Sequence, residues 1–158
     1  MHTVYNKHTK LYVLWVNLNG GKADYAVGTS TVPEGPFTFH NYANAAVAGA
    51  GDFDILIDDD ADASAYLIYT GTRTGHTMSL EKLSGDYLTS LATPGAIAAS
   101  VPALAGPIKS NISSGIIGMG FVEAPAIFKR KGVYYALFGN CCCFCGQGSG
   151  IGVRAFYI

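Results

Sequence analysis

The sequence has few charged residues and no excess of either sign. Asp, Glu, Lys and Arg make up 13% of its 158 residues, against about 25% in an average soluble domain. Ten basic and 11 acidic side chains leave a formal net charge of −1, so nothing indicates a surface for nucleic acid or an anionic membrane. Hydrophobic residues reach 49%, which excludes a disordered chain.

Targeting and membrane-spanning segments are also missing. Residues 1–8 lack the basic and apolar regions of a signal peptide. The sequence also contains no run of about 18 apolar residues, the length needed to span a bilayer. The most apolar stretch, residues 94–107, is rich in Ala and Gly and is broken by three prolines, so we expect a loop there. The chain is long enough for one domain with a core of its own.

Aromatic and β-branched runs bounded by Gly, Asp, Asn and Pro predict β-strands, whereas helical periodicity is weak. Three segments, residues 5–15, 57–69 and 128–138, repeat an apolar strand, a charged turn and a second strand beginning near a tyrosine. The equivalent tyrosines are Tyr12, Tyr66 and Tyr135. Such repeats favour β-propeller blades over a β-sandwich with hairpins that are alike by chance. Closed propellers have about four to eight blades, so three repeats predict an incomplete one.

Several blocks of sequence resemble the propeller enzymes of glycoside hydrolase family 43, above all the branch with β-1,3-galactanase-like members. They occur in the order of that family and cover nearly the whole chain: Gly35-Pro36-Phe37, residues 52–60 with 65–69 (its "D…DDDG.AYLIY"), residues 83–88 (its "LS.DYL") and residues 123–129 (its "EAPA.FK").

The resemblance implies an all-β fold, with about three blades of a five-bladed propeller in residues 1–158. The first blade and the C-terminal closing part would be missing. The implied activity is hydrolysis of O-glycosidic bonds in a plant or algal polysaccharide resembling β-galactan, with inversion. We expect a complete parent to be secreted and to act on a polysaccharide or oligosaccharide, and this chain alone to be inactive. No cofactor is expected, although some relatives hold calcium in the central channel; its ligands are not recognisable here.

Two carboxylates are the candidate catalytic residues. Glu123 lies in an apolar run, where a carboxyl group is either exposed at a strand edge or held in a poorly solvated pocket that raises its pKa. The resemblance implies that Glu123 is the general acid and Asp52 the carboxylate that tunes the pKa of that acid. Alternation along a strand would put Asp52 and Asp54 on one face. The general base of the family has no counterpart in this chain.

Trp15 and Tyr25 are the candidate substrate-binding residues, because the resemblance puts them where aromatic rings stack on sugars. The alternative for both is packing in the core, which we favour for Trp15 and leave open for Tyr25.

The acidic segment, with aspartates at 58, 59, 60 and 62, has the spacing of a calcium loop. It lacks the glycine and the bidentate glutamate of an EF-hand: Ala63 and Tyr69 stand at those positions. We therefore expect the acidic turn of a hairpin and no metal site.

Four cysteines form one cluster: Cys141, Cys142, Cys143 and Cys145. They lack the second pair or spaced histidines of a zinc site. Local disulfides are expected if the protein is secreted, but their pairing stays open.

The sequence leaves open three alternatives to an enzymatic function. The first is a propeller that binds glycans without cleaving them. The second is a structural domain in which the cysteines matter most, and the third is a fragment of a decayed gene.

Overall fold

The described part of the chain is built from three antiparallel β-sheets. The computed structural model describes residues 1–19, 21–47, 49–92, 114–118, 121–140 and 151–157. The predicted loop at 94–107 and the four clustered cysteines lie outside these residues. The single helical element described is a 3₁₀ turn, η1 (Thr72–Thr74). The all-β prediction is therefore confirmed.

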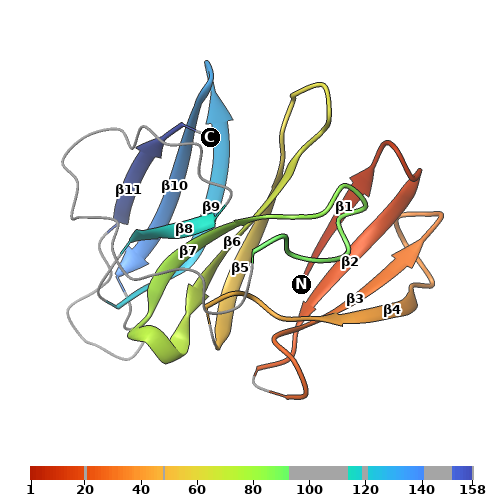
Figure 1. The fold of residues 1–158 in the computed structure, drawn as a ribbon, viewed down its shortest axis with the longest axis horizontal. Helices are drawn as coiled ribbons and strands as arrows, with labels where there is room; N and C mark the ends of the chain where they lie inside the picture. The colour runs from red at the N-terminus through yellow and green to blue at the C-terminus, as the bar shows by residue number, and fades with distance from the viewer. Residues whose placement is uncertain (20, 48, 93–113, 119–120, 141–150, 158) are drawn as a thin grey trace.

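The sheets stand side by side, in chain order (Figure 1). The first consists of β1 (His2–Asn6), β2 (Leu11–Asn17), β3 (Tyr25–Ser30) and β4 (Thr38–Ala43). The second consists of β5 (Ala50–Ile57), β6 (Ala65–Gly71), β7 (Thr77–Lys82) and β8 (Ser114–Gly118). The third consists of β9 (Val122–Arg130), β10 (Val133–Asn140) and β11 (Ile151–Phe156). Neighbours in each sheet are consecutive strands, as in propeller blades.

The three predicted hairpins are the first two strands of the three sheets. Tyr12, Tyr66 and Tyr135 all lie on second strands, where they pair with Tyr5, Leu56 and Phe128 of the preceding strands. The repeat in the sequence is therefore a repeat in structure. Because the sheets number three and follow one another, the sandwich alternative is excluded.

The core lies on both faces of the second sheet. Every residue of β6 is buried. Leu67 and Tyr69 pack in the cluster shared with the first sheet, while Tyr66 and Ile68 pack in the cluster shared with the third. Burial on both faces explains why β6 reads as a continuous apolar run rather than an alternating one.

The outer sheets are buried on one face only. In β2, Val13 and Trp15 are buried and the other residues of the strand are half-buried. The same alternation places Tyr134, Ala136 and Phe138 of β10 in the core. The remaining faces carry exposed large side chains, among them Tyr5, Phe39 and Tyr42 in the first sheet and Phe128 and Val153 in the third.

A segment after β7 ties the first two sheets together. Leu83 and Tyr87 belong to the core cluster between these sheets. The indole Nε1 of Trp15 donates to the backbone oxygen of Tyr87 at 2.9 Å, and Asn6 Nδ2 donates to that of Gly85 at 2.8 Å. Both of these donors thus have an acceptor across the interface between the two sheets.

Candidate active site

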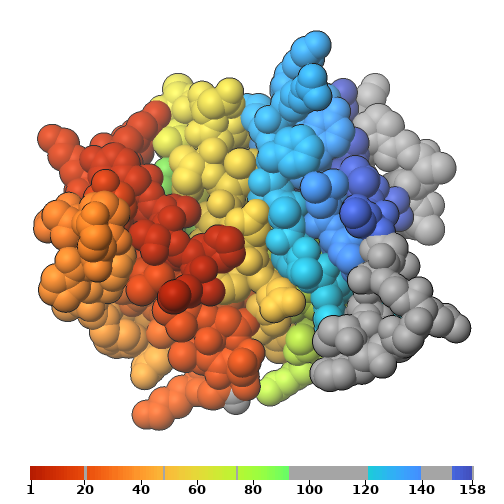
Figure 2. All heavy atoms as spheres, turned by 180° about the vertical axis from the view of Figure 1, so that it is seen from behind, coloured from red at the N-terminus to blue at the C-terminus, as the bar shows by residue number. Residues whose placement is uncertain are grey.

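A pocket of about 410 Å³ lies where the beginnings of β1, β5 and β9 meet. These are the first strands of the three sheets, so each sheet contributes to one site. Figure 2 shows red atoms of the first sheet, yellow atoms of the second and blue atoms of the third side by side on one face of the molecule. The lining residues are Met1, His2, Asn17, Asn19, Gly51, Asp52, Phe53, Ala124 and Pro125.

Asp52 lies in this pocket with its side chain exposed. The pairing of β5 with β6 is irregular between Ala50 and Phe53, so the strand is distorted where Asp52 leaves it. Asn17 Nδ2 donates to the backbone oxygens of Ala50 at 2.9 Å and Gly51 at 2.5 Å. The end of β2 therefore fixes the irregular segment that carries Asp52.

Glu123 is the second residue of β9 and is half-buried. The two residues that follow it, Ala124 and Pro125, line the same pocket as Asp52. Its Oε1 lies 2.6 Å from His76 Nδ1. The structure thus brings the strand segments that carry both predicted catalytic carboxylates to one pocket.

His76 is a site residue that the sequence did not indicate. Its ring stacks on Phe121 with 5.8 Å between ring centroids, and its backbone oxygen accepts a hydrogen bond from Val122 N at 3.0 Å. It therefore contacts both the start of β9 and the Glu123 carboxylate. An isolated histidine in the turn before β7 has no pattern that could have revealed this contact.

Asp54 links all three first strands. Its Oδ2 accepts a hydrogen bond from Ile127 N of β9 at 3.0 Å, and its Oδ1 lies 3.3 Å from His2 Nδ1 of β1. Between Asp52 and Asp54, Phe53 is buried in the core. Asp54 joins the strands, whereas Asp52 lines the pocket.

Trp15 and Tyr25 are core residues in this structure. Trp15 has 1% and Tyr25 0% of its surface exposed. Their rings meet edge to face at 5.4 Å, and Tyr25 packs likewise on Phe53 at 4.9 Å. Neither ring has surface free to stack on a sugar in this structure. Both pack in the core, the alternative that the sequence favoured for Trp15 and left open for Tyr25.

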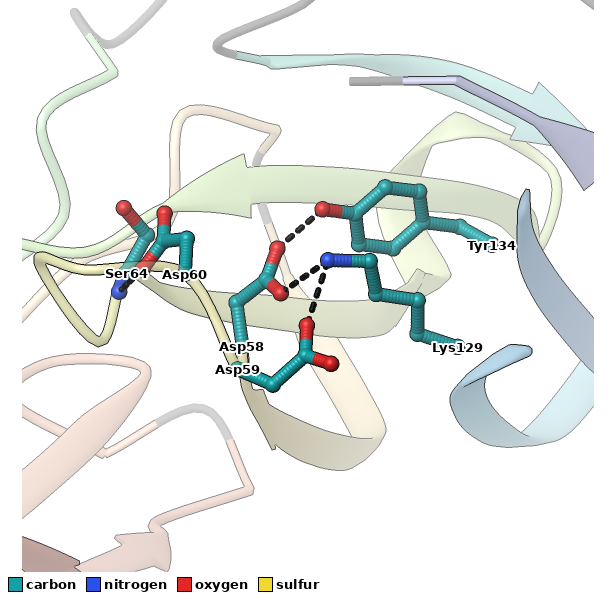
Figure 3. A network of polar contacts seen from close by, with 6 residues as sticks. All are labelled: Asp58, Asp59, Asp60, Ser64, Lys129 and Tyr134. Carbon is teal, nitrogen blue, oxygen red and sulfur yellow. Dashed lines mark hydrogen bonds and ion pairs between the residues drawn. The ribbon is translucent and has the colours of Figure 1, made fainter. Parts of the chain in front are cut away.

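The acidic segment is a hairpin turn, as expected, and it also joins two sheets (Figure 3). Asp60 Oδ1 accepts the Ser64 backbone N–H at 2.8 Å and closes the turn between β5 and β6. Asp58 is buried and pairs with Lys129 Nζ of β9 at 2.5 Å. It also accepts a hydrogen bond from the Tyr134 hydroxyl of β10.

Side chains of the third sheet compensate the negative charges of this turn. Burial alone would raise the pKa of Asp58, but the hydrogen bonds from Lys129 and Tyr134 outweigh it and hold that pKa below its ordinary value. Hydrogen bonds to Asp58 and Asp59 raise the pKa of Lys129. Asp58 thus acts as an anchor between sheets.

Neither a metal cluster nor a membrane helix is found in the part of the chain that the structure describes. No group of three or more His, Cys, Asp and Glu side chains there is arranged to hold a metal ion. No helix there is long and apolar enough to cross a bilayer.

Comparison with known proteins gave matches among solved structures. No protein-family model and no curated protein matches the chain. An exo-β-1,3-galactanase from Phanerochaete chrysosporium, solved with galactose, aligns with a TM-score of 0.70 at 22% identity, over 96% of this chain and 31% of that one. A β-1,3-galactosidase of glycoside hydrolase family 43 aligns with a TM-score of 0.69 at 23% identity, over 96% and 28%.

The chain has the fold of glycoside hydrolase family 43 propellers. An α-L-arabinofuranosidase from Clostridium thermocellum also aligns, with a TM-score of 0.63 at 18% identity, over 97% of this chain and 45% of that one. These neighbours are five-bladed propeller enzymes, so the resemblance seen in the sequence is confirmed at the level of the fold. The chain spans about a third of the length of the galactanase and the galactosidase.

Proposed function

We propose that the chain is part of an inverting glycosidase that hydrolyses a β-galactan-like polysaccharide, with Glu123 as the general acid. The observation that carries the proposal is the pocket at the first strands of all three sheets, with Asp52 in its lining and Glu123 directly before the lining residues Ala124 and Pro125 in the chain. A pocket of about 410 Å³ is within the range of small-ligand sites. The galactanase fold and the galactose bound to that neighbour support a saccharide as the ligand.

The chemistry follows from the two carboxylates. In an inverting reaction, the acid gives its proton to the glycosidic oxygen as the bond from that oxygen to the anomeric carbon breaks. Water attacks the opposite face of this carbon and passes its proton to a base. Glu123 supplies the proton, and Asp52 is the carboxylate that orients and tunes this acid. The base is not assigned to a described residue; in this proposal it belongs to blades outside the chain.

The test starts with the length of the natural protein. The transcript is sequenced upstream of Met1 and downstream of Ile158, and the longest encoded protein is purified. This protein is incubated with β-1,3-galactotriose, and the anomer released is followed by NMR spectroscopy. We expect release of galactose with inversion. Glu123→Gln should lower kcat by about 10²–10⁴-fold, the usual contribution of acid catalysis, while galactotriose still binds.

Two results would contradict the proposal. Binding of galactotriose without turnover in the unmodified protein favours the alternative, a propeller that binds glycans without cleaving them. Full activity of Glu123→Gln removes this residue as the acid. Glu34→Gln is the matched control, because Glu34 is exposed in the turn between β3 and β4 and should leave turnover unchanged.

A further inference from the structure

A second pocket adjoins the candidate active site. It has a volume of about 310 Å³ and is lined by Asn19, Gly49, Ala50, Gly51, Thr72 and Arg73. Asn19 and Gly51 line both pockets. The two pockets therefore lie next to each other, and Arg73 is the residue with a full charge in the lining of the second.

The segment that carries Arg73 is held in place by the loop before β5. The backbone N–H of Thr72 donates to the Gly49 oxygen at 2.7 Å, and the Thr72 hydroxyl donates to the same oxygen. This anchors the 3₁₀ turn η1 to the wall of the pocket. Arg73 therefore projects from a fixed turn.

The stem of Arg73 packs directly on Gly49. A Cβ atom at position 49 would lie 2.6 Å from Arg73 Cγ, and Gly49 has a φ of +74°. Only glycine combines this backbone conformation with so close a contact. The packing limits the freedom of the arginine stem at the wall of the pocket.

The charge of Arg73 is not used within the described part of the chain. The ion pairs found there involve His2, His76 and Lys129, and none includes Arg73. Arg73 thus has a fixed stem, lies beside the candidate saccharide pocket and has no carboxylate partner among the described residues. It is therefore suited to bind an anionic group of a ligand. Its planar guanidinium can donate two parallel hydrogen bonds to a carboxylate or a sulfate.

We infer that the second pocket is a subsite for an acidic sugar, in which Arg73 binds a carboxylate or sulfate substituent of the saccharide. The inference rests on the proposed function, because it takes the adjoining pocket as the site of the neighbouring sugar. It narrows the substrate class from a neutral galactan to one with anionic substituents.

The test compares three probes with the same longest encoded protein. Neutral β-1,3-galactotriose, galactotriose carrying one glucuronic acid unit and galactotriose carrying one sulfate are titrated by calorimetry. We expect at least one acidic probe to bind about tenfold more tightly than the neutral one, as one charge-assisted contact allows. The stronger of the two acidic probes identifies the anionic group. Raising the salt concentration should reduce the preference.

Variants assign the preference to Arg73. Arg73→Gln should abolish it and leave binding of the neutral probe unchanged, and Arg73→Lys should retain part of it. Arg154→Gln is the control, because Arg154 is an exposed arginine on β11 of the third sheet and should keep the full preference. Equal binding of all three probes, or a preference that survives Arg73→Gln, overturns the inference.

This outcome is separable from failure of the proposed function. If neutral galactotriose is cleaved but the acidic probes show no preference, only the acidic subsite is wrong. If no probe binds, both proposals fail. If acidic probes bind through Arg73 but no probe is cleaved, the acidic subsite is supported and the proposed glycosidase activity is wrong.

Discussion

The imidazole of His76 lies 2.6 Å from the carboxylate of Glu123, joining the turn before β7 to the start of β9. The same histidine receives a backbone hydrogen bond from Val122, the residue before Glu123. Two contacts from one residue therefore fix both the main chain and the side chain at the proposed acid. His76 is in this sense a positioning residue.

Loss of His76 should reduce turnover more than binding. We expect His76→Ala to lower kcat on galactotriose about tenfold and to change KM less than twofold, because the Glu123 carboxylate loses its orientation. His76→Asn retains a polar side chain next to the carboxylate and should recover much of the rate. His40→Ala, at an exposed histidine of β4, is the control. A wild-type kcat for His76→Ala would show that the contact has no role in turnover.

Asn17 should matter for both stability and the Asp52 segment. Asn17→Ala removes the donor to Ala50 and Gly51, and we expect a loss of about 1–2 kcal/mol in the free energy of unfolding. Saccharide binding should weaken as well, measured by calorimetry. Asn41→Ala is a matched control, because Asn41 Nδ2 donates to the Leu88 oxygen and Asn41 does not line the pocket. Equal effects of both variants on binding would contradict the role of Asn17.

The contacts of Asp58 should make the free energy of unfolding depend on pH in the acid range. Its folded-state pKa is lowered, so its contribution is complete above the unfolded pKa of about 3.9 and is lost as the pH falls through the lower folded value. We expect Asp58→Asn to cost about 2 kcal/mol at pH 7 and to flatten the decline in stability that begins as the pH falls below about 4. Denaturant unfolding at several pH values measures both effects. Asp62→Asn, an exposed residue of the same turn, should leave the acid decline unchanged.

Tyr25 and Trp15 should respond differently to loss of their polar atoms. Among the described residues the buried Tyr25 hydroxyl has no hydrogen-bond partner, so Tyr25→Phe should be neutral or stabilise the protein by about 1 kcal/mol. Trp15→Phe removes the hydrogen bond to Tyr87 and leaves a cavity, and should cost about 2–3 kcal/mol. Thermal unfolding measures the two variants. Weaker saccharide binding by a stable Tyr25→Phe protein would restore its binding role.

The sequence predicted the fold better than the site. The hairpin pattern around Tyr12, Tyr66 and Tyr135 is local, since a charged turn and a paired strand are contiguous in the chain. The family blocks likewise indicated Glu123 and Asp52, whose segments meet at the pocket. These inferences needed no knowledge of distant contacts.

The missed features are those that depend on packing between sheets. His76, Asn17 and Arg73 have no motif around them, and each gains its place from a contact with another element. For Trp15 and Tyr25, the sequence alone does not distinguish an aromatic ring that binds sugar from one that packs in the core. Their burial is decided by the second sheet, which closes over them.

The enclosure of β6 on both faces has a consequence for how the molecule comes apart. Detaching either outer sheet would expose one complete apolar face of the second sheet to water, at a large cost in free energy. The Asp58 pair adds a polar connection across one of these interfaces. The three sheets should therefore melt as one cooperative unit, and partial unfolding should be confined to turns and strand ends.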